Sequence, residues 1–90
     1  MTSGGSPQPI AARELFTRHA RKDGRSVAVL RALDYGDFCL VEAAVYPQAN
    51  AKHEPQLPGP YRFADAHQAT AFVTQAVEAL MYLGCDVQAA

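Results

Sequence analysis

A single amphipathic segment near the end of the chain, residues 61–85, most constrains the fold of this 90-residue protein. Asp65 is a typical helix N-cap, and Gln68, three residues later, completes the pattern of a capping box. Apolar residues then recur at spacings of three and four, which predicts a helix over about 66–83 with a wide apolar stripe. Gly84 is the residue type that ends helices. The stripe consists of Ala69, Phe72, Val73, Ala76, Val77, Leu80 and Leu83.

The sequence before this helix is typical of antiparallel strands. Two turn signals, Asp23-Gly24 and Tyr35-Gly36-Asp37, lie about a dozen residues apart, and each is flanked by β-branched or aromatic residues. Residues 26–33 and 38–46 are therefore predicted to form an antiparallel hairpin. Residues 61–63, which read Tyr-Arg-Phe, are predicted to form a short additional strand.

The segment 13–22 is open to two interpretations. As a helix, it would carry an apolar face and end at Gly24. As a strand, it would pair with 26–33 across the Asp-Gly turn, and this turn together with the equal spacing favours the strand. The predicted fold class is therefore α+β, an antiparallel meander of three to four strands packed on one C-terminal helix. Its strands lie at about 14–21, 26–33, 38–46 and 61–63 and its helix at about 66–83, in the order β-β-β-β-α; the alternative, with residues 10–22 helical, is α-β-β-β-α.

Composition divides the chain into a tail and one small domain. Residues 1–12 are mostly Ser, Gly, Pro and Gln, which predicts a flexible tail, and residues 13–90 are predicted to form a single α+β domain. Within it, the loop 47–60 is rich in proline and is either functional or disordered. The two isolated cysteines, the lack of a secretory pattern and the lack of a long apolar run lead us to expect a cytoplasmic location and no membrane partner.

One helix can cover only one face of a sheet, yet both faces of the predicted hairpin are apolar. The uncovered face must meet another surface, and a second copy of the chain would stabilise so small a core. We therefore predict a homodimer through the open sheet face. The competing interpretation is a monomer in which a helical N-terminal segment covers that face. The predicted dimer-face residues are Ala28, Leu30, Phe38, Leu40 and Tyr46.

Charge is distributed unevenly along the chain. The hairpin 18–31 is basic, and aromatic residues flank it at Phe16, Tyr35 and Phe38, a combination that single-stranded nucleic acids bind. The order β-β-β-β-α also resembles that of PurA-like and Whirly-like single-strand binding proteins, in topology alone. Against this alternative, the net charge is −1 and a basic edge strand often serves only to prevent strand pairing. The nucleic-acid candidates are Arg18, Arg21, Lys22, Arg25 and Arg31.

No catalytic, cofactor or metal site is predicted. His19, His53 and His67 are dispersed, without the spacing of metal ligands, and the chain contains no GxSxG, P-loop or GxGxxG motif. We therefore expect a non-catalytic interaction or accessory domain. Besides nucleic-acid binding, a further alternative is a small-molecule site at the loop 47–60, where His53, Glu54 and Tyr61 would have to converge.

Overall fold

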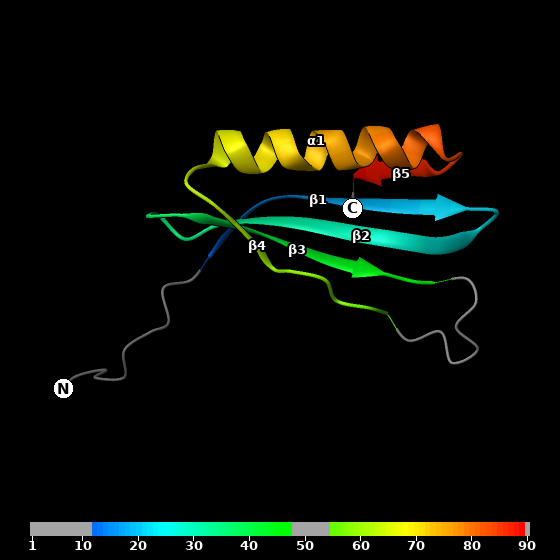
Figure 1. Ribbon diagram of the computed structural model, residues 1–90, viewed down its shortest axis with the longest axis horizontal. Helices are drawn as coiled ribbons and strands as arrows, with labels where there is room; N and C mark the ends of the chain where they lie inside the picture. Colours follow the sequence, from blue (N-terminus) through cyan, green and yellow to red (C-terminus); the bar gives the residue numbers. More distant parts are fainter. Residues whose placement is uncertain (1–11, 48–54, 90) are drawn as a thin grey trace.

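The computed structural model describes residues 12–47 and 55–89, and these form one five-stranded antiparallel sheet with a helix on one face (Figure 1). The α+β prediction is confirmed. The sheet has the order β4-β3-β2-β1-β5. Most of the predicted tail, and residues 48–54 of the proline-rich loop, lie outside the described part of the chain. The elements are β1 (Arg13–Lys22), β2 (Arg25–Asp34), β3 (Cys39–Val45), β4 (Tyr61–Phe63), α1 (Ala66–Tyr82) and β5 (Asp86–Ala89).

The strand interpretation of segment 13–22 is correct, and the helical alternative is not supported. β1 and β2 are joined by a two-residue turn in which Asp23 has φ 53° and Gly24 has φ 76°. Two successive positive φ angles are typical of a type I′ turn, whose twist matches that of paired strands. Local turn chemistry therefore decides between strand and helix here.

A second tight turn fixes the register of β2 against β3. The Tyr35 N–H donates to the Phe38 carbonyl at 2.9 Å, so only Gly36 and Asp37 lie between the paired residues. Gly36 has φ 95°, and the Asp34 carboxylate accepts a hydrogen bond from its N–H at 2.8 Å. The pairing continues from Asp34 opposite Cys39 to Ala28 opposite Val45. Even-numbered residues of β2 therefore share a face with odd-numbered residues of β3.

The helix α1 begins as the sequence predicts. Asp65 is the N-cap, and its side chain accepts a hydrogen bond from the Gln68 N–H at 2.9 Å. The Gln68 side chain in turn accepts from the Ala64 N–H at 3.2 Å. The first of these bonds satisfies a backbone donor that the first turn would leave without a partner, and the second ties the residue before the N-cap to the helix.

The end of α1 leads into a strand that was not predicted. Gly84 has φ 91°, its N–H donates to Met81, and the Cys85 N–H donates to Leu80, both at 3.0 Å. This is the Schellman arrangement. The chain then reverses, and β5 pairs antiparallel with the outer edge of β1. The prediction of three to four strands is therefore corrected to five, in the order β-β-β-β-α-β.

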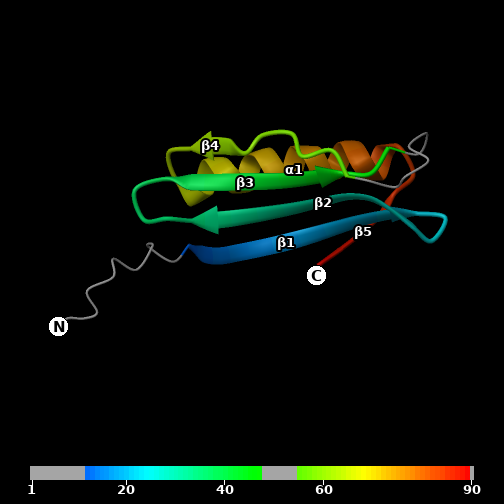
Figure 2. The ribbon, with the colours of Figure 1, turned by 90° about the horizontal axis from the view of Figure 1, so that it is seen from below.

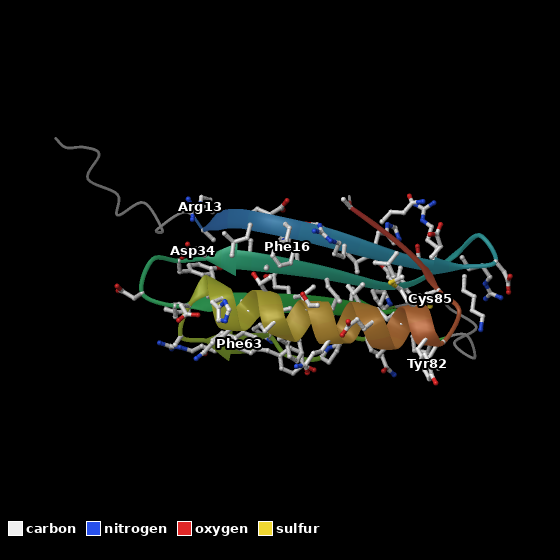
Figure 3. All side chains as sticks on the ribbon, turned by 90° about the horizontal axis from the view of Figure 1, so that it is seen from above. Arg13, Phe16, Asp34, Phe63, Tyr82 and Cys85 are labelled. Carbon is white, nitrogen blue, oxygen red and sulfur yellow. The ribbon has the colours of Figure 1, made fainter. Side chains whose placement is uncertain are left out.

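The core lies between α1 and one face of the sheet. Side chains of β2 and β3 meet the helix stripe there, and Phe63 of β4 packs against Phe72 at 5.1 Å between ring centroids (Figure 3). On the outer side of the last helical turn, Tyr82 is 95% exposed. The most buried members of the core cluster are Leu30, Ala32, Cys39, Val41, Ala69 and Val73.

Two predicted dimer-face residues belong to this core, so their assignment to the open face was wrong. Ala28 is 5% exposed and Leu30 is 7% exposed. The reason is the register, which pairs Leu30 with Ala43 and so turns both toward α1. The sheet face that does lie opposite α1 carries no described helix or strand, as Figure 2 shows from that side.

Candidate interaction site

The open face is built from five rows of paired side chains across β2 and β3. The Tyr46 N–H donates to the Val27 carbonyl at 2.9 Å, so this pair continues the ladder beyond β3. Because strand residues alternate between faces, every second pair from here points away from α1. Most of these side chains are half-buried, whereas Leu33 is buried and Arg31 is exposed. The rows are Val27–Tyr46, Val29–Ala44, Arg31–Glu42, Leu33–Leu40 and Tyr35–Phe38.

An ion pair occupies the middle row of this face. Arg31 Nη2 and Nε both donate to Glu42 Oε1, at 2.6 and 3.1 Å. Arg31 Nη1 also lies 3.9 Å from Glu14 Oε1 on the neighbouring strand β1. The hydrogen bond and the charge of Glu42 raise the pKa of Arg31 above its ordinary value. The guanidinium is therefore held in place by two carboxylates.

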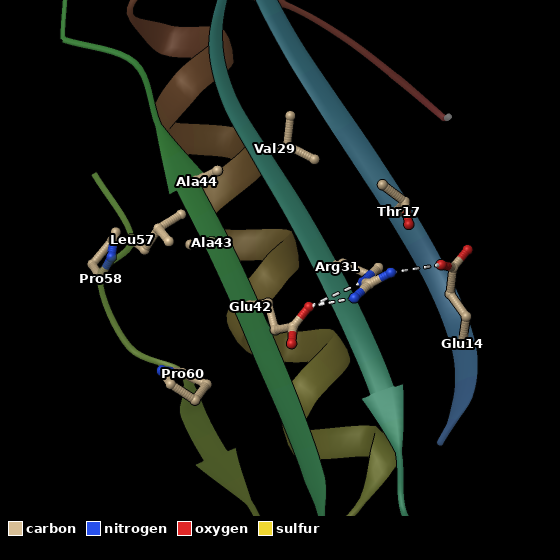
Figure 4. Close-up of a pocket in the computed structure, with 10 residues that line it drawn as sticks. All are labelled: Glu14, Thr17, Val29, Arg31, Glu42, Ala43, Ala44, Leu57, Pro58 and Pro60. Carbon is tan, nitrogen blue, oxygen red and sulfur yellow. Dashed lines mark hydrogen bonds and ion pairs between the residues drawn. The ribbon is translucent and has the colours of Figure 1, made fainter. Parts of the chain in front are cut away.

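A cavity of ≈ 570 Å³ opens beside this ion pair (Figure 4). Val29 and Ala44 form its floor, and Leu57 borders it from the segment that runs along the edge of β3 (Figure 4). Leu57 is 72% exposed, which is high for a large apolar side chain. Pro58 and Pro60 complete the apolar wall, and Glu14, Thr17, Arg31 and Glu42 supply the polar one.

The same segment leaves a short stretch of the β3 edge without a paired strand. Residue Gln56 exchanges two backbone hydrogen bonds with Val45, and pairing resumes where Tyr61 meets Val41. Between these points Ala43 faces the edge, because antiparallel pairs alternate in bonding direction. Among the described residues, no backbone hydrogen bond joins Ala43 to the segment 57–60. Backbone donors and acceptors therefore line the cavity beside its apolar wall.

An aromatic cluster lies at the opposite end of the rows. The rings of Tyr35 and Phe38 stack at 5.1 Å with an interplanar angle of 10°. The Arg62 guanidinium of β4 lies over the Phe38 ring at 4.2 Å. Phe38 thus joins Leu40 and Tyr46 on the open face, the three predicted dimer-face residues that have this position.

The predicted nucleic-acid residues do not form one surface. Arg18 lies over the Phe16 ring at 4.9 Å and donates to the Thr17 carbonyl. Lys22 donates to the Leu83 carbonyl at 3.0 Å, where it compensates the negative end of α1. Arg31 is paired with Glu42. These three cations are therefore engaged within the chain.

The remaining two candidates, Arg21 and Arg25, are exposed near the β1–β2 turn. The stacked pair Tyr35–Phe38 follows the other end of β2, ten residues away along an extended strand. A strand of that length spans about 33 Å, so Arg21 and Arg25 are far from the stacked rings of Tyr35 and Phe38. The strand β5 also departs from the element order on which the topological resemblance rests.

The histidine and cysteine side chains of the described strands have contacts that a purely structural role explains. His19 Nε2 lies 2.9 Å from the Ser26 hydroxyl. Cys39 is 2% exposed, and its burial, together with the nearby Asp34 carboxylate, raises the pKa of the thiol. Within residues 12–47 and 55–89, no three His, Cys, Asp or Glu side chains are grouped as a metal site would require. His53 and Glu54, predicted to border a small-molecule pocket, lie outside the described residues.

No family model, curated protein or solved structure matches this chain. In the described part of the chain, no helix has both the length and the apolar character needed to cross a membrane. Inference about function therefore depends on the residues of the open face.

Several residues of the site were not found from the sequence. Arg31 was assigned to nucleic-acid binding, and its neighbours Glu42 and Glu14 were given no role. Once the Gly36–Asp37 turn sets the register, the pairing of Arg31 with Glu42 follows from numbering alone. Leu57 has no such local signal, because its place depends on the path of a loop.

Proposed function

We propose that this protein is a non-catalytic interaction domain that forms a homodimer through the open sheet face. The observation that carries the proposal is the row structure of that face, in which half-buried apolar side chains flank an ion pair and no described element covers them. Surfaces that combine apolar side chains with oriented charges are typical of protein interfaces. The occupant is inferred to be a second copy.

Charge balance supports a second copy over other partners. The open face carries two carboxylates, Glu14 and Glu42, and two guanidinium groups, Arg31 and Arg62, at register positions that share this side of the sheet. A nucleic acid or a strongly charged protein would favour a face of one sign. The central part of this face, which carries both signs, can instead complement itself in a second copy.

The oligomeric state of the purified chain tests this proposal. We expect sedimentation velocity to show a reversible monomer–dimer equilibrium between low and high micromolar concentration. Leu40→Asp should weaken dimerisation by about 100-fold or more, because burying an unpaired carboxylate on both copies costs several kcal/mol. Ala71→Asp, on the exposed side of α1, is the matched control and should leave dimerisation unchanged.

Circular dichroism at low concentration should show that both variants retain the native secondary structure. If the unmodified chain sediments as a monomer throughout the range, the proposal is wrong. If Ala71→Asp disrupts the dimer and Leu40→Asp does not, the chain associates through the helix side instead.

A second candidate function is small-molecule binding, which the cavity beside Leu57 favours. Its volume of ≈ 570 Å³ lies in the range of ligand pockets, and backbone groups of Ala43 stand beside an apolar wall. The test is saturable binding of the fluorescent probe anilinonaphthalene sulfonate by the dilute chain. Ala44→Phe should fill the cavity and abolish that binding, whereas Ala71→Phe should not. A probe signal that never saturates would exclude this candidate.

A further inference from the structure

We infer that the two copies meet about a two-fold axis that runs parallel to the strands between β2 and β3. Each Arg31 then faces Glu42 of the partner subunit. This inference rests on the proposed homodimer and specifies its register. It concerns which residues meet across the interface, so it can fail while dimerisation itself stands.

The geometry follows from the order of the rows. A rotation of 180° about an axis along the strands preserves the position of each row and exchanges the two strands on either side of the axis. β2 of one copy therefore lies over β3 of the other, row by row. Arg31–Glu42 is the third of the five rows, so it lies at the centre of the stacked surface. Facing sheets lie about 10 Å apart, which two long charged side chains can bridge.

The Arg31–Glu42 row also disfavours the other possible two-fold axis, which would lie between the sheets and run across the strands. An axis across the strands, along the central row, would place each residue of that row over its own copy and would exchange the rows on either side of it. Arg31 would then face a second Arg31, and Glu42 a second Glu42. Like charges in contact at an interface cost several kcal/mol, whereas the axis along the strands alternates their signs.

Both members of the central pair have capacity for a second partner. Glu42 accepts both bonds from Arg31 through Oε1, and among the described residues no hydrogen bond reaches Oε2. The side chains of Arg31 and Glu42 are 46% and 45% exposed, so a facing copy can approach them. Guanidinium groups have five N–H donors, and Arg31 uses two of them on Glu42. A four-residue network can therefore form without breaking the existing pair.

A second pair of charges fits the same axis independently. Glu14 of β1 lies opposite Leu33, and Arg62 of β4 lies opposite Leu40, so both belong to one row. They stand at equal distances on either side of the β2–β3 boundary. The proposed rotation places each Glu14 over Arg62 of the partner subunit. Two rows thus carry charges of opposite sign at symmetry-related positions.

The apolar rows are compatible with this arrangement. Val29 would face Ala44 of the partner subunit, and Leu33 would face the partner's Leu40. A larger side chain thus lies over a smaller one in the Val29–Ala44 row, and two leucines, of which Leu33 is already 5% exposed, meet in the Leu33–Leu40 row. Matched volumes of this kind allow two sheet faces to pack closely.

Charge exchange tests the register. R31E and E42R should each weaken homodimerisation by at least about tenfold, because each substitution acts twice in the symmetric dimer and turns an attraction into a repulsion. An equimolar mixture of the two variants should form a heterodimer, since one chain now has two carboxylates in the central row and the other has two cations. Arg25→Glu and Glu78→Arg carry the same charge changes at exposed positions and are the controls.

The outcomes separate the two proposals. A monomeric unmodified chain would refute the homodimer. A dimeric unmodified chain whose R31E and E42R variants behave like the controls, or fail to pair on mixing, would overturn the axis and leave the homodimer intact. If either single variant fails to fold, the pair E14R and R62E tests the same axis, and its mixture should also form a heterodimer.

Discussion

The two faces of the sheet differ in the size of their side chains, although these alternate residue by residue along the same strands. Beneath α1, β2 and β3 present mainly small side chains such as Ala32 and Cys39, which are 0% and 2% exposed. The opposite face presents larger ones, including Leu40 and Tyr46, which are only half-buried. Small side chains allow the helix to approach closely and pack densely. The larger side chains of the open face retain surface that no described helix or strand buries.

The charges follow the same division. The central ion pair lies on the open face, whereas no charged or polar side chain among the described residues is fully buried. The covered face therefore stabilises the fold mainly by apolar contact, with polar contacts such as that of Lys22 with the Leu83 carbonyl at its margin. The centre of the open face combines apolar contact with directional charge. Directional charge fixes register between two surfaces more than it adds affinity.

The largest expected effect comes from placing a charge on the covered face. Val41 is 0% exposed, and Val41→Asp would bury a carboxylate without a partner, at a cost of about 4 kcal/mol or more. That is most of the stability of a small domain, so we expect the variant to be unfolded by circular dichroism. Its neighbour Leu40 provides the comparison, because Leu40→Asp should fold and lose only dimerisation. Equal unfolding of both variants would contradict the distinction between the faces.

Enlarging a side chain between α1 and the sheet should lower the stability of the fold by a smaller amount. Ala69 of α1 is 0% exposed against the sheet, and Ala69→Leu would force α1 outward at a cost of about 1–3 kcal/mol. Ala79→Leu adds the same atoms on the exposed side of the helix and should change stability by less than about 0.5 kcal/mol. Denaturant titration below the dimerisation range measures both. An unchanged stability of Ala69→Leu would mean that α1 is not closely packed against the sheet at this position.

The alkylation rates of the two cysteines should also differ between a covered and an accessible position. Cys39 is buried under α1, and burial raises the pKa of its thiol, whereas Cys85 is partly exposed after the helix. In native buffer, alkylation of Cys39 should be at least about tenfold slower than that of Cys85, because it requires local opening. Mass spectrometry of the labelled peptides measures each rate, and Cys85→Ala should remove the fast phase. Equal rates would show that the core opens readily.

The fold was largely predictable because its turns and caps are local. Asp23-Gly24 indicates a type I′ turn whatever follows it, and Asp65 with Gln68 indicates a helix start from four residues. β5 was missed because its four residues, Asp86–Ala89, alternate polar with apolar over only two repeats, which is the lower limit of a strand signal. Its strand conformation depends on pairing with β1, which lies 65 to 71 residues earlier, and a short pattern does not encode such a distant partner.

The site was less predictable because it depends on register. The sequence correctly indicates that two faces of the hairpin are apolar, yet Ala28 and Leu30 were assigned to the wrong one. A shift of one residue exchanges the faces, and only the two-residue turn at Gly36-Asp37 determines which residues pair. The position of Leu57 beside the cavity depends on how the segment 55–60 follows the edge of β3, which no short pattern encodes.

The smallest effect concerns the turn that sets this register. The Asp34 carboxylate accepts the Gly36 N–H at 2.8 Å and lies 3.1 Å from Arg13 (Figure 3), and these contacts lower the pKa of Asp34, the backbone hydrogen bond most strongly. Because the folded pKa is below the unfolded value of about 3.9, ionised Asp34 stabilises the fold above that pH, and the contribution is lost as the pH falls through the folded pKa. Asp34→Asn keeps an acceptor oxygen and removes the titration. The stability advantage of the unmodified chain over this variant should therefore shrink below about pH 4, as denaturant titrations across acid pH would measure. Asp37→Asn, in the same turn, is the matched control, and an advantage that persists in acid would mean that hydrogen bonding by Asp34, rather than its charge, holds the turn.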